Sequence, residues 1–79
     1  MVTPEQIKSL IEAGLPDATV EVVGDDGTHF AARVVSPSFA GQGKLAQHRM
    51  VYATLGERMG EEIHALSLST LTPDQAGGR

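Results

Sequence analysis

The stretch ATVEVVGDDGTHFAARVV, residues 18–35, decides the fold. Residues 18–23 and 29–35 alternate apolar and polar side chains, as half-buried β-strands do. Between them, Gly24-Asp25-Asp26-Gly27 is a turn sequence that tolerates the positive φ angles of tight hairpins. We therefore expect an antiparallel hairpin. Its second strand points one set of residues toward the core, namely Phe30, Ala32 and Val34, and the other set away from it, namely His29, Ala31 and Arg33.

A helix is predicted before this hairpin, at residues 4–13. Thr3 is a good N-cap, and Gln6 three residues later completes a capping box, while proline suits the first helical position. Gly14 ends the helix. Its apolar stripe at helical spacing consists of Ile7, Leu10 and Ile11.

A loop, a helix and a strand are predicted after the hairpin, at residues 36–43, 44–59 and 63–71. Gly60 ends the helix, whose apolar face is expected to comprise Leu45, His48, Val51, Tyr52, Leu55 and Met59. The core-facing set of the strand is expected to comprise His64, Leu66 and Leu68. Residues 73–79 begin like a helix but soon meet two glycines, so we expect a frayed tail on a single domain.

The predicted order of elements is α-β-β-α-β. The short turn makes the first two strands antiparallel, and the helical connection makes the second and third parallel, with a right-handed crossover. Both helices then cover one face of a three-stranded mixed sheet, which is a type II KH-like α+β fold. The opposite face is left exposed, lined by Thr19, Glu21, Ala31, Arg33, Ser67 and Ser69.

The composition narrows the range of functions. The chain has 79 residues and no cysteine, which excludes a disulfide framework, a thiol nucleophile and an iron–sulfur cluster held by its own thiolates. No apolar run is long enough to span a membrane, and the N-terminus resembles no signal peptide, so we expect a cytoplasmic protein. No nucleophile is spaced beside a base, so we expect no enzyme.

Charge is distributed unevenly along the chain, whose net charge is −4. Residues 1–26 carry one lysine and six acids, and residues 57–79 carry two arginines and four acids. Residues 27–56 carry no acid and three cations, namely Arg33, Lys44 and Arg49. A basic segment thus lies within an acidic protein, although three cations are few for DNA.

Two histidines are candidates to meet in space. His29 opens the second strand and His64 opens the third, and parallel strands begin at the same edge of a sheet. His64 is either a metal ligand or a histidine bonded to a carbonyl, and Asp25 and Asp26 either orient a site near His29 or solvate a turn. Strict alternation points His29 outward and His64 inward, so convergence needs a bulge or loop freedom. His48 is expected to be a core residue.

A second candidate site opens the second predicted helix. Gly41-Gln42-Gly43-Lys44 offers backbone N–H groups, a helix N-terminus and an ammonium to an anion or phosphate. It is neither a Walker A loop nor the GXXG loop of RNA-binding KH domains, because Leu45 and Lys44 occupy the decisive positions. The alternative is that the glycines shape a turn and the lysine is solvated.

Several motifs resemble those of the BolA family and together span nearly the whole chain. They are Thr28-His29-Phe30, Phe39-Ala40-Gly41, Gln47-His48-Arg49-Met50-Val51-Tyr52, Ile63-His64-Ala65-Leu66 and Thr72-Pro73. The short hairpin is similar to that of the IbaG-like branch. Two positions depart from the family pattern: Gln47 replaces the usual arginine, and no tryptophan follows Thr72-Pro73.

The resemblance implies a type II KH-like domain that partners a monothiol glutaredoxin and shares a 2Fe–2S cluster in cluster assembly, trafficking or iron sensing. It implies that glutaredoxin and glutathione supply thiolates and that His64 supplies an imidazole. The family's second ligand, His or Cys, comes from the loop between the first two strands, which makes His29 the candidate here.

Two other functions remain open alongside this one. The family also implies a DNA-binding transcriptional regulator, whose contacts would come from Gly41, Gly43, Lys44 and Arg49. The other alternative is an adaptor that binds glutaredoxin without touching a cluster. A weak homo-oligomer is also left open.

Overall fold

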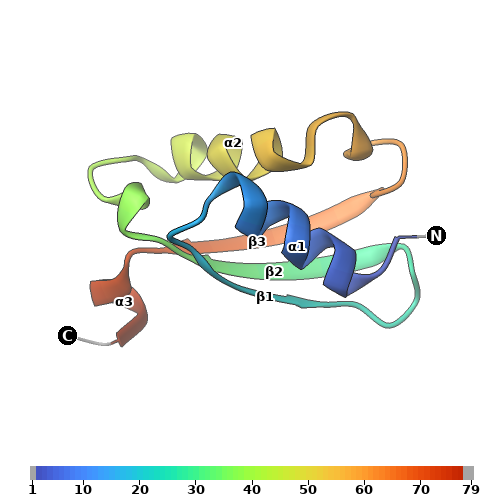
Figure 1. The fold of residues 1–79 in the computed structure, drawn as a ribbon, viewed down its shortest axis with the longest axis horizontal. Coiled ribbons are helices and arrows are strands. Elements are labelled where there is room, and N and C mark those ends of the chain that lie inside the picture. The colour runs from blue at the N-terminus through green and yellow to red at the C-terminus, as the bar shows by residue number, and fades with distance from the viewer. Residues whose placement is uncertain (1, 78–79) are drawn as a thin grey trace.

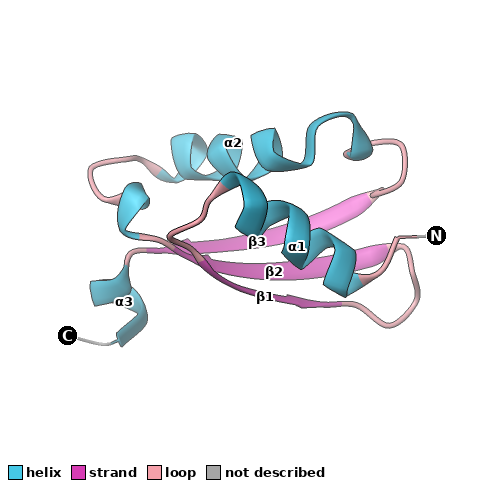
Figure 2. Ribbon diagram, viewed as in Figure 1, coloured by secondary structure: helices cyan, strands magenta, loops and turns pink. Residues whose placement is uncertain are grey.

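The computed structural model describes residues 2–77, which form a sheet with helices packed on one face (Figure 1). The elements in chain order are α1 (Pro4–Gly14), β1 (Thr19–Val23), β2 (His29–Val35), α2 (Lys44–Leu55), β3 (Ala65–Leu71) and α3 (Pro73–Gly77). Figure 2 shows α1 and α2 side by side over the sheet, with the short α3 at one end.

The sheet has the predicted topology, with strand order β1-β2-β3. β1 pairs antiparallel with β2, so that Val20 lies opposite Val34. β2 pairs parallel with β3, with His29 opposite Ala65 and Val35 opposite Leu71. The α+β, type II KH-like prediction is therefore confirmed.

α1 forms as its sequence predicts. The Thr3 backbone N–H donates to Gln6 Oε1 at 2.9 Å, and the Gln6 N–H donates to Thr3 Oγ1 at 3.2 Å, which completes the capping box. Its last residue, Gly14, passes so close to α2 that a Cβ there would lie 2.5 Å from Thr54 Cγ2. A glycine at this position lets the two helices approach each other.

The core lies between the helices and the sheet. The inward set predicted for β2 is confirmed: Phe30, Ala32 and Val34 are all buried, while His29, Ala31 and Arg33 are exposed. The remaining buried hydrophobic residues are Val2, Ile7, Ile11, Val20, Phe39, Val51, Leu55 and Ile63. Leu66 and Leu68 pack against this core from β3, as predicted.

Two predictions for α2 are wrong. The helix ends at Leu55, because Gly56 adopts a positive φ of 56°, and a 3₁₀ turn replaces the predicted last turn. Its buried face also differs, since Leu45 and Tyr52 are exposed and the buried residues are Gln47, Val51 and Leu55. Hydrophobic periodicity counts a glutamine as polar, so it does not assign Gln47 to the buried face of the helix.

The C-terminal segment, predicted to be a frayed tail, contains a short helix. Residues 73–77 form α3, and the Thr72 N–H donates to Gln75 Oε1 at 2.9 Å, a capping interaction that fixes the start of this short helix. The predicted tail also includes Gly78 and Arg79, which lie outside the described residues. Among the helices of residues 2–77, none combines the length and the hydropathy that a membrane span requires.

Candidate metal-binding end of the sheet

The two candidate histidines lie at the same end of the sheet. His29 is the first residue of β2 and pairs with Ala65, the first residue of β3. His64 directly precedes Ala65 in the chain. The predicted meeting of the two strand openings is therefore present in the backbone.

His64 is exposed, which corrects the expectation that it points inward. The strand begins at Ala65, so the alternation of the ladder does not extend to residue 64. The core position at this end is filled instead by Ile63, whose side chain is fully buried. His64 is thereby left facing solvent beside a buried anchor.

The backbone around His64 is held in place although its side chain is exposed. The Ile63 N–H donates to the Arg58 carbonyl at 2.9 Å, and the Gly60 N–H donates to the Ile63 carbonyl at 2.8 Å. Gly60 has a φ of 90°, a conformation that L side chains rarely adopt. The segment entering β3 is thus fixed from both sides of residue 63.

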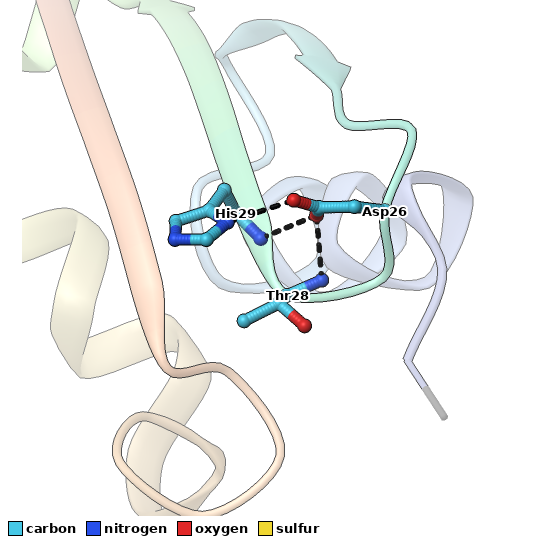
Figure 3. Close-up of polar contacts among 3 residues, drawn as sticks. All are labelled: Asp26, Thr28 and His29. Carbon is cyan, nitrogen blue, oxygen red and sulfur yellow. Dashed lines mark hydrogen bonds and ion pairs between the residues drawn. The ribbon is translucent and has the colours of Figure 1, made fainter.

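His29 is held by the hairpin that precedes it (Figure 3). Its ring Nδ1 lies 2.8 Å from Asp26 Oδ2, and its backbone N–H donates to Asp26 Oδ1 at 2.8 Å. The Thr28 N–H donates to the same Oδ1 at 2.9 Å. The other end of the His29 ring points away from Asp26, and its side chain is 73% exposed.

These contacts also set the charge of Asp26. The backbone N–H of His29, its ring and the backbone N–H of Thr28 all favour the ionised carboxylate, so the pKa of Asp26 lies far below its ordinary value. Asp26 therefore carries a full negative charge at neutral pH. Of the two interpretations of the acidic turn, orientation of a nearby site is the one that this geometry favours.

The donor set at this end fits one half of a shared metal group. Two exposed imidazoles on neighbouring strand openings are suitable ligands for iron, and His₂ ligation of one iron of a 2Fe–2S cluster is known chemistry. Among residues 2–77, no group of three or more His, Cys, Asp or Glu side chains is placed to hold a metal ion alone. A metal ion at this end would need further ligands from outside this set of residues.

The second candidate site lies at the other end of the sheet. Gly41 has a φ of 79°, and Gly43 is the N-cap of α2 without a side-chain hydrogen bond to the helix. The Lys44 ammonium donates to the Thr70 carbonyl near the end of β3, although the residue is exposed. Arg49 is exposed on α2.

The three central cations do not form one basic patch. Arg33 lies on the open face of the sheet, where its Nη1 is 3.8 Å from Glu21 Oε1. Lys44 and Arg49 belong to α2, which covers the opposite face (Figure 1). His48 is half-buried on α2, and its ring makes no hydrogen bond within the part of the chain that the structure describes.

A buried polar cluster was not found by sequence reasoning. Gln47 Nε2 donates to the Phe39 carbonyl at 3.2 Å and to the Gln42 carbonyl at 2.9 Å. Thr70 Oγ1 donates to Gln47 Oε1 at 2.7 Å. The one available signal was Gln47 at a position where the BolA pattern has arginine. The structure shows that the glutamine at this position is buried and makes interior hydrogen bonds.

Comparisons with known proteins identify the family. The model of the BolA-like protein family matches residues 11–75. Protein BOLA2 of Arabidopsis thaliana is 43% identical over 79 residues, which cover 95% of this chain and 84% of that protein. The DNA-binding transcriptional regulator BolA of Escherichia coli K12 is 33% identical over 81 residues, covering 91% of this chain and 77% of that protein.

The fold comparison agrees. The solved structure of a bolA protein homologue from Coxiella burnetii superposes with a TM-score of 0.88 and 50% identity, covering 98% of this chain and 99% of that one. Against human BolA-like protein 1, the chain spans 57% of the relative's length. These matches do not separate the branches of the family, so the IbaG-like assignment stays a prediction. The chain belongs to the BolA-like protein family.

Proposed function

We propose that this chain is a non-catalytic, cytoplasmic partner of a monothiol glutaredoxin, with which it shares a 2Fe–2S cluster in cluster assembly, trafficking or iron sensing. The observation that carries the proposal is the placement of His29 and His64 at adjacent strand openings, both exposed. Membership of the BolA-like family supports the choice of partner.

The chemistry divides between two proteins. This chain has no cysteine, so the thiolates must come from glutaredoxin and glutathione. Its contribution is neutral imidazole nitrogen on a rigid strand end, and imidazole in place of thiolate raises the reduction potential of such a cluster.

The proposal is tested by anaerobic reconstitution. The native chain is mixed with a monothiol glutaredoxin, glutathione, ferrous iron and sulfide, and visible circular dichroism is recorded against glutaredoxin alone. We expect a new spectrum that belongs to a 1:1 heterodimer in size-exclusion chromatography. If a stable heterodimer forms but the glutaredoxin spectrum is unchanged, this proposal is wrong. The result would instead support an adaptor that binds glutaredoxin without contacting the cluster.

A second candidate function is DNA binding, because the Escherichia coli relative is named a DNA-binding transcriptional regulator. Its structural support is the N-terminus of α2, where Gly43 provides no side-chain cap for the first-turn N–H groups and the first turn contains no acidic residue. Arg49 adds an exposed cation on the same helix. The engagement of Lys44 with Thr70 reduces what that side chain offers to phosphate.

DNA binding is tested by its salt dependence. If the N-terminal part of α2 contacts phosphates, the plot of log association constant against log salt concentration has a negative slope. Replacing both Lys44 and Arg49 by alanine is then expected to make this slope shallower by about two. Fluorescence anisotropy of a labelled duplex between low and physiological salt measures this slope. The absence of binding by the native chain at low salt would remove this candidate.

A further inference from the structure

The Asp26 carboxylate contacts both the backbone and the ring of His29, whereas closing the turn requires only backbone contacts. One carboxylate oxygen accepts the backbone N–H groups of Thr28 and His29, at 2.9 and 2.8 Å. The other oxygen lies 2.8 Å from His29 Nδ1. The first pair of bonds closes the turn, and the third acts on the ring (Figure 3).

The third bond determines where the ring carries its proton. An ionised carboxylate is only an acceptor, so the neutral imidazole must place its N–H at Nδ1 to make this contact. The lone pair is then at Nε2, on the side of the ring that points away from the hairpin. Nε2 is the atom through which a metal or any other electrophile could reach His29.

We propose that Asp26 is the positioning residue for His29, selecting the Nδ1–H tautomer and presenting Nε2 as the ligand atom at the shared cluster. The role of Nε2 as a cluster ligand rests on the proposed function, whereas the choice of tautomer does not. Metal-ligating histidines commonly donate their second ring N–H to a carboxylate, which fixes the ring and raises its basicity.

The neighbouring acid provides a matched control. Asp25 adjoins Asp26 in the same hairpin and carries the same charge, yet makes no hydrogen bond or ion pair with any of residues 2–77. Asp25→Asn therefore removes one negative charge without touching the His29 ring. Any difference between Asp25→Asn and Asp26→Asn reports the hydrogen bond and not the net charge.

Asp26→Asn is the informative variant because it keeps the shape of the turn. The amide oxygen of the new side chain can accept the two backbone N–H groups, while its NH₂ then faces His29 Nδ1 and favours the opposite tautomer. Asp26→Ser is the second variant, since its hydroxyl can close the turn but is too short to hold the ring. Both variants keep the turn closed, so an effect that they share reports the loss of the carboxylate contact with the ring.

The first readout is the tautomer in the free chain, with no metal present. Long-range ¹H–¹⁵N correlation spectra, recorded at about pH 8.5 so that histidine is neutral, distinguish Nδ1–H from Nε2–H. We expect His29 to be Nδ1–H in the native chain and in Asp25→Asn, and to lose that form in Asp26→Asn. A native ring in the Nε2–H form, or an Asp26→Asn ring in an unchanged tautomer, would overturn the assignment.

The second readout is the stability of the reconstituted heterodimer cluster to an iron chelator. We expect the circular dichroism signal to decay about tenfold faster in Asp26→Asn than in Asp25→Asn. Equal decay in these two variants, with a native heterodimer spectrum present, would overturn the positioning role. If the native chain gives no heterodimer spectrum, the proposed function fails, and the tautomer measurement still decides whether Asp26 orients the ring.

Discussion

Replacing His64 by alanine is expected to abolish the visible circular dichroism spectrum of the heterodimer while leaving the fold intact. The side chain is exposed and makes no hydrogen bond within residues 2–77, so its removal should change the free energy of unfolding by less than about 0.5 kcal/mol. Under the proposed function, the spectrum depends on the His64 imidazole, which no other described residue at the start of β3 can replace as a ligand. Urea unfolding and reconstitution, measured on the same preparation, check both halves of this prediction.

Two further variants sharpen the result. His48→Ala removes a histidine from α2, away from the proposed site, and is expected to keep the spectrum. His64→Cys supplies a thiolate at the same position and is expected to restore cluster binding with a shifted spectrum, because both side chains are iron ligands. A native spectrum in His64→Ala would exclude His64 as a ligand.

The position of the two candidate sites makes them separable. β2 and β3 run parallel, so the histidines lie at their beginnings, whereas the loop at residues 36–43 and the start of α2 lie at their ends. A seven-residue strand is about 20 Å long, which keeps the two sites apart (Figure 1). A substitution at either end should therefore leave the other activity unchanged.

Local sequence was sufficient for most of the fold. The Asp-Gly turn predicted the antiparallel hairpin, and the alternation in residues 29–35 predicted that Phe30 faces the core and His29 faces away from it. The capping box at Thr3 predicted the start of α1. These signals succeed because each one depends on neighbours within a few residues.

The candidate site was predictable in its topology and not in its orientation. Because β2 and β3 are parallel, residues 29 and 64 lie at the same end of the sheet. The residue that precedes a strand does not follow the inward–outward alternation of side chains within it. His64 is exposed because Ile63 fills the core, a choice made by packing between distant elements. The contact of Asp26 with the His29 ring likewise depends on the three-dimensional course of the turn.

The buried face of α2 was predicted incorrectly because it contains a glutamine. Substitution of this glutamine is expected to have the largest effect on stability. Gln47 is 4% exposed and its amide bonds three groups: the carbonyls of Phe39 and Gln42 before α2 and the hydroxyl of Thr70 in β3. No buried side-chain nitrogen or oxygen among the described residues lacks a partner. A satisfied buried glutamine can thus occupy the position that a leucine would normally take.

Gln47→Leu is expected to lower the free energy of unfolding by about 2–4 kcal/mol, because it deprives the buried Thr70 hydroxyl of its acceptor and removes the donor that serves two carbonyls. Thr70→Val alone leaves the Gln47 amide oxygen unpaired and should cost about 1–3 kcal/mol. The double variant should be more stable than the sum of the single losses predicts, by about 1 kcal/mol, since neither member of the pair is then left buried without its partner. Urea unfolding of all four proteins completes this double-mutant cycle, and additivity within about 0.3–0.5 kcal/mol would show that Gln47 and Thr70 are not coupled. Because Gln47 also holds the loop that leads to Gly43, coupling would mean that the core and the entry to α2 are stabilised by the same side chain.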